Sequence, residues 1–314
     1  MTAEEFAAFW GVQGHRIIRT ASCFWYNVGP LSFLGIPYHR DVSPSAGELM
    51  ELFLRGPAAI VRFSGEAPPA NGGLFVCSDR GYSLVSLDKK ARNQTRRGLE
   101  NSQVKQVDFT YLANAGHSIN QETFVRQGRH PETIPEHRWV RYCNAASRTP
   151  DIEAWGAFIG GDLAAFVVTA LVEDCFSILH QASRTSSLSC YPNNALTFDV
   201  TKRKLACPGI AYVSYGLKSV EDTSSLDHYK LQMGFGVRPR SDQMVLHPLL
   251  RTAARYGGRR FVRWMARCYP GSDLWRKATS VLGERGIPAV HENHASAAAA
   301  VPADQVHHPT TRGS

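Results

Sequence analysis

The chain has 314 residues, of which 43% are hydrophobic and 20% are charged, and its formal net charge is +8 at pH 7. A chain of this length buries a proper core in one large domain or two of ordinary size. The composition is typical of a soluble globular protein and excludes a disordered or membrane-embedded one.

The start of the chain, MTAEEFAAFW, is acidic and lacks the basic and apolar blocks of a secretory signal. The longest apolar run, at 163–172, has about half the length of a membrane span. We therefore expect a cytoplasmic protein without a transmembrane segment.

Short apolar runs separated by Gly and Pro predict strands in the first ninety residues, at 16–20, 58–65, 73–78 and 82–87. Ser45 and Glu48 form a capping-box pair before the apolar stretch LMELFL and predict a helix there. From Asp88, a predicted N-cap, the pattern is helical through KKARNQTRRGLEN. A strand is predicted over 104–112, and helices are predicted over 121–127 and 135–146.

The clearest pattern begins at residue 152, where two strand-like runs flank the turn Gly160-Gly161-Asp162. Glycine tolerates the positive φ of a tight hairpin turn. A second turn at 173–174 leads into the strand CFSILHQA. The sequence therefore predicts a hairpin followed by a third strand.

A helix, a strand, a second helix and a last strand follow. The first helix has Asn193 or Asn194 as its N-cap and ends at 208–209. IAYVSYGL is a buried strand by its β-branched and apolar content. SSLDHYKLQMGF is a helix with Ser224 or Ser225 as N-cap, and VRPRSDQMVLHP returns as a strand.

The positive charge is concentrated in two blocks. Residues 251–285 contain nine Arg or Lys against two acidic residues, within two predicted amphipathic helices, and 89–97 contain five basic residues and no acid. Such blocks are typical of contacts with polyphosphate cofactors, RNA or lipid headgroups, and also of solvated helix faces. The last residues, 286–314, are rich in Ala, His and Pro and are expected to be a disordered tail.

Neither a metal nor a disulfide framework is expected. The seven cysteines include no C-x-x-C pair, and no histidines outside the tail form an H-x-x-x-H pair. The chain also lacks a G-x-S-x-G elbow and a Walker loop, which excludes serine hydrolases and P-loop NTPases.

The order of predicted elements resembles the GNAT acyltransferase superfamily, and within it the Fem-type (FemAB-like) branch of aminoacyl and acyl transferases. Three segments carry the likeness: the GGD hairpin, NALTFDVTKRKLACPGIAYVSYGL, and LDHYKLQMGF, in which a helix bearing Tyr-Lys ends in Gly-Phe. KKARNQTRRGLE is similar to the basic helix that precedes this core in Fem-type relatives.

The resemblance implies an α/β fold in which helices flank a central mixed sheet. The transferase core is expected at 88–246, after a degenerate N-terminal copy of the fold at 1–87. A basic helical extension at 247–285 and the tail at 286–314 are expected to follow.

The sequence departs from the superfamily pattern at the expected donor site. GNAT enzymes cradle the pyrophosphate of coenzyme A in a loop Q/R-x-x-G-x-G/A, whose glycines let backbone N–H groups approach phosphate oxygens. Here the same place holds SRTSSLSCYPNNA, without a glycine. Fem-type proteins that use aminoacyl-tRNA do not need this loop. The predicted donor-binding residues are Gln181, Arg184, Asn193 and Asn194.

Acyl transfer to an amine needs an oriented donor, a base for the amine, a site for the oxyanion and a proton for the leaving group. In this fold the donor lies where two neighbouring parallel strands splay, here CFSILHQA and IAYVSYGL. His180 ends the first of these strands and is the predicted general base, because an ordinary histidine pKa suits neutral pH. The alternative is a hydrogen-bonded core histidine.

The helix that ends in Gly-Phe is expected to face the same gap. Tyr229 is predicted to protonate the leaving group, and Lys230 to neutralise developing charge or bind a phosphate. In common GNAT enzymes the tyrosine stands five residues before the Phe, a position that Lys230 holds here. The alternatives are a tyrosine packed on the sheet and a surface lysine. The predicted acceptor-binding residues are Ser214, Tyr215 and His228.

Three functions remain open. The first is an N-acyltransferase that uses acyl-CoA or another acyl thioester and a small-molecule amine. The second is a Fem-type aminoacyl-tRNA-dependent transferase acting on a peptide or cell-wall-precursor amine, with the basic segments contacting RNA. The third is a non-catalytic protein that binds nucleic acid or an anionic membrane surface.

Overall fold

The computed structural model describes residues 1–29, 31–56, 58–65, 71–218 and 224–253. Its α-helices are α1 (Ala3–Val12), α2 (Ala46–Arg55), α3 (Lys89–Asn101), α4 (Phe109–Arg126), α5 (Glu136–Ser147), α6 (Pro192–Leu205), α7 (Ser224–Gln232) and α8 (Pro248–Ala253). The strands are β1 (Ile17–Arg19), β2 (Phe24–Gly29), β3 (Ser32–Ile36), β4 (Ile60–Gly65), β5 (Gly72–Cys77), β6 (Gln103–Val107), β7 (Ile152–Ile159), β8 (Asp162–Val172), β9 (Cys175–Ser183), β10 (Tyr212–Leu217) and β11 (Gly236–Leu246). Short 3-10 turns occur at η1 (Leu84–Ser86), η2 (Pro131–Thr133) and η3 (Thr185–Cys190).

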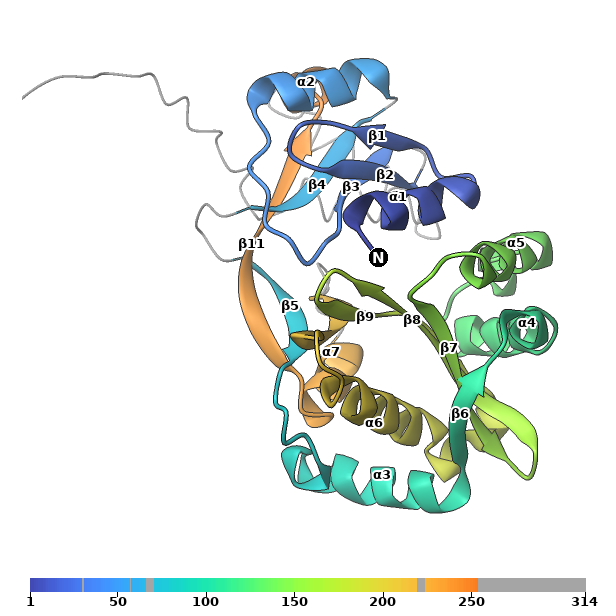
Figure 1. Cartoon of the computed structure of the whole chain (residues 1–314). Coiled ribbons are helices and arrows are strands. Elements are labelled where there is room, and N and C mark those ends of the chain that lie inside the picture. The colour runs from blue at the N-terminus through green and yellow to red at the C-terminus, as the bar shows by residue number, and fades with distance from the viewer. Residues whose placement is uncertain (30, 57, 66–70, 219–223, 254–314) are drawn as a thin grey trace, which may run out of the picture.

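The strands form one mixed sheet in the order β1-β2-β3-β4-β11-β5-β10-β9-β8-β7-β6. Among the described strands, the pairs β3/β4 and β9/β10 are parallel and the other pairs are antiparallel. β11 pairs with two strands in turn: its residues 236–240 pair with β5, and its residues 241–246 pair with β4 (Figure 1). A single long strand therefore connects the N-terminal strands to the rest of the sheet.

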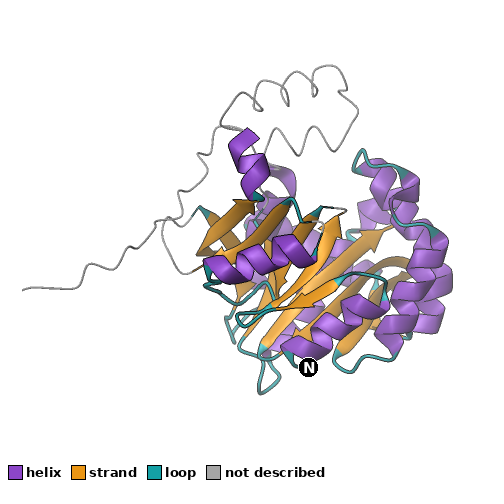
Figure 2. Cartoon of the chain, turned by 90° about the horizontal axis from the view of Figure 1, so that it is seen from above, coloured by secondary structure: helices purple, strands orange, loops and turns teal. Residues whose placement is uncertain are grey.

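Helices cover both faces of the strands β7–β9. α4 and α5 lie on one face with α1 beside them, around Phe6, Trp139 and Phe166 (Figure 1). α3, α6 and α7 lie on the other face, around Leu196 and Phe235. Figure 2 shows the helices along the flanks of the sheet.

The two-sided cover explains the long apolar run at 163–172. Almost every residue of β8 is buried, as expected for a strand with helices on both faces. Among the described residues, no helix has the length and apolar content that a membrane span needs.

Several local predictions are confirmed. Ser45 and Glu48 form a full capping box at the start of α2. Asp88 accepts a hydrogen bond from the backbone N–H of Lys90 and caps α3. In the hairpin between β7 and β8, Gly160 and Gly161 both have positive φ, at 60° and 93°.

Three local predictions are wrong. Residues 82–87 contain the 3-10 turn η1 (Leu84–Ser86) instead of a strand. The Tyr82 hydroxyl donates to the carbonyl of Met233, and Arg92 donates to the carbonyls of Leu84 and Leu87. The strand predicted over 104–112 stops at Val107, since Asp108 caps the next helix.

The third correction concerns the cap of α6. Tyr191, in the left-handed region with φ 55°, is the N-cap, and Pro192 takes the first helical position, which suits its fixed φ. The side chain of Asn193 instead contacts β9, and that of Asn194 reaches Met233. The predictions for 254–285 and for the tail at 286–314 lie outside the described residues.

Candidate functional site

β9 and β10 lie side by side and then part. Their parallel pairing covers Tyr212 with Cys175, Val213 with Phe176, and Ser214 with Ser177, and it ends there. Both strands are irregular just beyond this point: β10 shifts register against β5 between Ser214 and Leu217, and β9 shifts against β8. The predicted pair of strands that separate at one end is therefore present. We call the part in which β9 and β10 no longer pair with each other, residues 178–183 and 215–217, the wedge.

A bulge in β9 decides which way its side chains point. Val168 of β8 pairs with His180 and Thr169 pairs with Ile178, so Leu179 is an extra residue. Ile178 and Gln181 then face α6, whereas Leu179 and His180 both face α4. The bulge thus sends two predicted site residues, His180 and Gln181, to opposite faces of the sheet.

Four of the predicted residues meet on the α6 face of the wedge. The Tyr215 hydroxyl donates to Oε1 of Gln181. Nε2 of Gln181 donates to Oδ1 of Asn193 at 3.2 Å, and the Tyr229 hydroxyl donates to the backbone carbonyl of Asn193 at 3.2 Å. Side chains from β9, β10, α6 and α7 therefore form one polar cluster, which we call the wedge cluster.

Thr197 belongs to the wedge cluster and was missed in the sequence. Its hydroxyl lies 3.1 Å from Nε2 of Gln181 and 3.2 Å from the Tyr229 hydroxyl. The available signal was its spacing, because residues 193 and 197 are four apart and share one face of a helix.

Both tyrosines of the wedge cluster keep their protons at neutral pH. Burial raises the pKa of Tyr229 to about 12, although the hydrogen bond from Thr197 opposes it. Burial also raises the pKa of Tyr215 well above its ordinary value. Each hydroxyl can therefore donate a proton or a hydrogen bond, but neither is a base.

Lys230 is buried beside the wedge cluster, so the alternative of a surface lysine is wrong. Only 5% of the residue is exposed, and its Nζ lies 3.4 Å from Oδ1 of Asp227 and 4.4 Å from the centre of the Phe75 ring. Burial lowers the pKa of Lys230, and Asp227 partly offsets this effect. The Nζ of Lys230 is therefore buried, paired with Asp227, and next to the wedge.

His180 lies on the α4 face, where its Nε2 is 2.6 Å from Oδ1 of Asn120. The rings of Trp139 and Phe166 each lie 5.7 Å from the imidazole. Burial lowers the pKa of His180 to about 4, and the positive charge of Arg129 adds to this shift. The structure does not bring His180 into the wedge cluster, and its role as a base stays a prediction.

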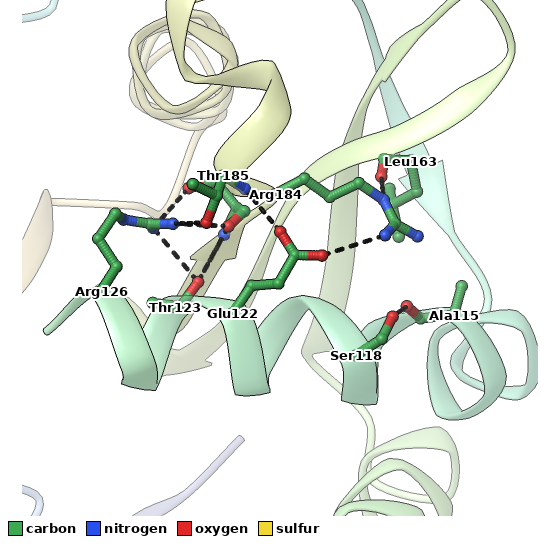
Figure 3. Close-up of polar contacts among 9 residues, drawn as sticks. Ala115, Ser118, Glu122, Thr123, Arg126, Leu163, Arg184 and Thr185 are labelled. Carbon is green, nitrogen blue, oxygen red and sulfur yellow. Dashed lines mark hydrogen bonds and ion pairs between the residues drawn. The ribbon is translucent and has the colours of Figure 1, made fainter. Parts of the chain in front are cut away.

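Arg184 is held by carboxylate and backbone groups at the end of β9 (Figure 3). Its Nε donates to the carbonyl of Leu163 at 3.0 Å, and its Nη1 lies 3.4 Å from Oε1 of Glu122. The other oxygen of Glu122 accepts the backbone N–H of Thr185 at 2.7 Å. Arg126 of α4 contacts Ser183 and Thr185 of the same segment.

This segment is the one predicted to bind coenzyme A, and it does not fit the usual phosphate cradle. The Glu122 carboxylate already accepts the first N–H of η3. The start of α6 is covered by α3, since a Cβ on Gly98 would lie 2.6 Å from the carbonyl oxygen of Tyr191. The first N–H of η3 is therefore already occupied, and α3 packs closely against the start of α6, where an incoming pyrophosphate would need free N–H groups.

The other predicted residues lie at the edge of this arrangement. Ser214 is fully buried and its hydroxyl accepts from the N–H of Gly216 at 3.3 Å. Nδ2 of Asn194 points to the sulfur of Met233 at 3.5 Å, away from the wedge cluster. His228 is exposed on α7.

No family model matches the chain, and no curated protein matches it. The structure of FemX does, with a TM-score of 0.54 over 79% of this chain and 92% of that one, at 10% identity. The chain has a Fem-type fold. The C-terminal domain of a protein described as a lysylphosphatidylglycerol synthetase from Agrobacterium fabrum matches with a TM-score of 0.52 over 77% and 87% of the two chains, at 11% identity. L-PGS from Bacillus licheniformis matches over the same shares with a TM-score of 0.50 and 13% identity.

The likeness confirms the predicted fold class, an α/β GNAT-like fold with a large mixed sheet between helices. At such low identity it shows the fold alone. Within the Fem-type fold, the wedge cluster, Lys230 and the segment around Arg184 are the features on which a function can be argued.

Proposed function

We propose that the protein is a transferase that moves an aminoacyl group from aminoacyl-tRNA to an amine. The observation that carries the choice of donor is the carboxylate of Glu122 on the N–H of Thr185, at the place where a coenzyme A pyrophosphate would bind. A carboxylate and a pyrophosphate repel each other and compete for the same N–H group. A donor held through an RNA does not need this position.

The reaction places the ester carbonyl of the donor at the wedge. The amine nitrogen attacks the carbonyl carbon and loses a proton to a base, for which His180 is the candidate. The carbon–oxygen bond to the ribose then breaks, and the ribose oxygen takes up a proton. Tyr229, protonated because of its burial, is the candidate donor of that proton. The products are an amide and the free hydroxyl of the tRNA.

Lys230 supports the same chemistry by charge. Negative charge develops on the carbonyl oxygen as the amine attacks, and a buried positive charge stabilises it more strongly than a charge in water does. Lys230 is held in place by Asp227 and by the Phe75 ring.

The exposed face of α3 is the proposed contact with RNA. Lys89, Lys90, Arg96 and Arg97 are exposed, and the spacing of seven residues between the two pairs puts them on one face of the helix. Arg92 is excluded from this face, because it donates to backbone carbonyls of η1 and the following loop. We call these four residues the α3 stripe.

Binding to bulk tRNA at several salt concentrations tests the RNA contact. The variant Lys89→Glu/Lys90→Glu is expected to bind more weakly and with a shallower dependence on salt, by roughly 0.9 in the log–log slope for each lost phosphate contact. Arg138→Glu/Arg141→Glu on α5 makes the same change in net charge on the other side of the sheet and is the matched control.

Transfer is measured with tRNA carrying radiolabelled amino acids and a panel of small amines and peptides. Label in an amide product supports the proposal, and its loss in Lys230→Met ties the product to this site. Tight binding of tRNA with no transfer to any amine contradicts the transferase and favours a nucleic-acid-binding protein.

An acyl thioester is the second candidate donor, because the separated strands and the protonated tyrosine would equally serve a thioester and its leaving thiolate. Calorimetry with coenzyme A separates the two donors. Binding at micromolar concentration by the wild-type protein favours the thioester, and no binding favours the RNA-linked ester.

A further inference from the structure

Asn120 and His180 form a buried side-chain pair between α4 and β9. The Nε2 atom of His180 lies 2.6 Å from Oδ1 of Asn120, and Asn120 is fully buried. Sixty residues separate the two in the chain, so the pair depends on the packing of α4 against the sheet.

The hydrogen bond decides which nitrogen of His180 carries the proton. An amide oxygen only accepts hydrogen bonds, so Nε2 of the neutral ring must carry the hydrogen, and the lone pair is then on Nδ1. Burial lowers the pKa of His180, which keeps the ring neutral at pH 7. In the described part of the chain, Nε2 is the ring nitrogen for which a partner is found.

The ring is also held in orientation. Trp139 and Phe166 lie on α5 and β8 at 5.7 Å from the imidazole, and Nε1 of Trp139 donates to the carbonyl of Leu112 at 3.1 Å. The bulge at Leu179 is what turns His180 toward these groups. His180 as a residue is half-buried, and it lies on the stretch of β9 beyond its pairing with β10.

Asn120 has spare hydrogen-bonding capacity. Its Nδ2 is buried and has no hydrogen-bond partner among the described residues, and the same is true of the Tyr142 hydroxyl on α5. A buried amide donor without a protein partner is costly for a purely structural contact.

We propose that Asn120 is a positioning residue that fixes the Nε2–H tautomer of His180 and so presents Nδ1 as the base that takes the proton of the attacking amine. The inference rests on the proposed transfer to an amine and extends it by one residue. The proton moves from the amine nitrogen to Nδ1, while Nε2–H stays bonded to Asn120 and stabilises the imidazolium through the amide dipole.

The charges around the pair are few. Arg129, which follows α4, acts on His180 and opposes its protonation. The other charged groups described on α4 near β9 are engaged elsewhere, Glu122 with Arg184 and Arg126 with Ser183 and Thr185. α5 presents Tyr142 and Cys143 to this region, and burial raises the pKa of both, so both stay neutral at pH 7.

The first experiment is an NMR titration of the full chain labelled with ¹⁵N-histidine, with His180→Gln to assign the signals. The expected result at pH 7 is the Nε2–H tautomer of His180, with no protonation until well below the ordinary histidine range. Asn120→Asp puts a carboxylate on Nε2–H and is expected to raise the pKa of His180 by about one to three units. Asn114→Asp, on the exposed face of α4, is the control for charge.

The second experiment is the pH profile of kcat/KM for transfer. The acid limb is expected to move upward in Asn120→Asp, and Asn120→Leu is expected to lose at least about tenfold in kcat/KM, a part of the factor that general bases supply. Circular dichroism of Asn120→Leu checks its folding. If this variant misfolds, the pH profile of Asn120→Asp still tests the role of Asn120.

The outcomes separate the two proposals. An Nδ1–H tautomer in a protein that performs transfer, or an unmoved acid limb in Asn120→Asp, overturns the role of Asn120 alone. The expected tautomer in a protein that transfers to no amine overturns the proposed function, and with it the catalytic use of the pair.

Discussion

The hydroxyl of Tyr215 donates a hydrogen bond to Oε1 of Gln181 and thereby joins β10 to β9 beyond the last backbone pair of these strands. Thr197 and Asn193 hold the amide of Gln181 from the other side. The two strands are therefore separated in their backbones but connected by side chains on the α6 face. A donor that lies between them must approach from the α4 face or displace this bridge.

Tyr215→Phe tests the bridge. The variant keeps the ring against Tyr229 and Phe235 and removes only the hydroxyl. We expect a loss of about 1 kcal/mol in the free energy of unfolding, the usual size of one buried hydrogen bond, measured by urea denaturation. If the bridge closes the wedge, the KM for the donor falls while kcat changes little.

Tyr111→Phe is the matched control, because Tyr111 is 40% exposed on α4 and far from the wedge cluster in the fold. Equal stability of wild type and Tyr215→Phe would contradict the bridge as a stabilising contact.

Glu122 is expected to exclude phosphate from the start of η3. In Glu122→Gln the carboxylate becomes a neutral amide, so Arg184 loses its charge partner and the repulsion of an incoming anion disappears. We expect the variant to bind inorganic pyrophosphate or coenzyme A more tightly than the wild type by calorimetry. Glu136→Gln, at the exposed start of α5, changes the net charge equally. The same affinity in all three proteins would show that Glu122 does not control the site.

Gly98 is expected to tolerate no side chain. A Cβ there would lie 2.6 Å from the Tyr191 carbonyl oxygen and 3.1 Å from Cβ of Ala195, so α3 and α6 would have to move apart. We expect Gly98→Ala to cost about 1–3 kcal/mol, as overpacked positions do, and to lower the unfolding midpoint. Gly47→Ala in α2 meets nothing closer than 3.7 Å and is expected to stabilise by up to about 1 kcal/mol. A neutral Gly98→Ala would mean that the contact between the helices is loose.

The order of elements from β7 to β11 could be predicted from the sequence because each element carries its own local signal. The glycines of the hairpin, the apolar run of β8 and the Gly-Phe stop after α7 all act within a few residues. Local signals failed where a distant group decides the outcome. Residues 82–87 have the apolar content of a strand, but their hydrogen bonds go to Met233 and Arg92.

The site followed the same division. The spacing of Tyr229, Lys230 and Phe235 placed the first two beside the wedge. The side on which His180 lies depends on the bulge at Leu179, which no pattern in the strand announces, and its partner Asn120 is sixty residues away. Asp227 and Glu122, which neutralise Lys230 and Arg184, are ordinary helix residues until the tertiary structure is known.

The buried ammonium of Lys230 predicts a dependence of stability on pH. The pKa of Lys230 is lowered from 10.5 in the folded protein, so the unfolded chain keeps this proton to a higher pH than the folded one does. Between the lowered pKa and about 10.5 the unfolded state binds more protons, and the free energy of unfolding therefore rises with pH through this window. Below the window the contribution is constant.

Urea denaturation of wild type and Lys230→Met from pH 7 to 10.5 isolates the effect, since the tyrosines are common to both proteins. As pH rises, the free energy of unfolding of the wild type is expected to increase relative to that of Lys230→Met. Lys202→Met, at an exposed lysine, is the control. A difference that stays flat across the window would show that Lys230 is as well solvated when folded as when unfolded.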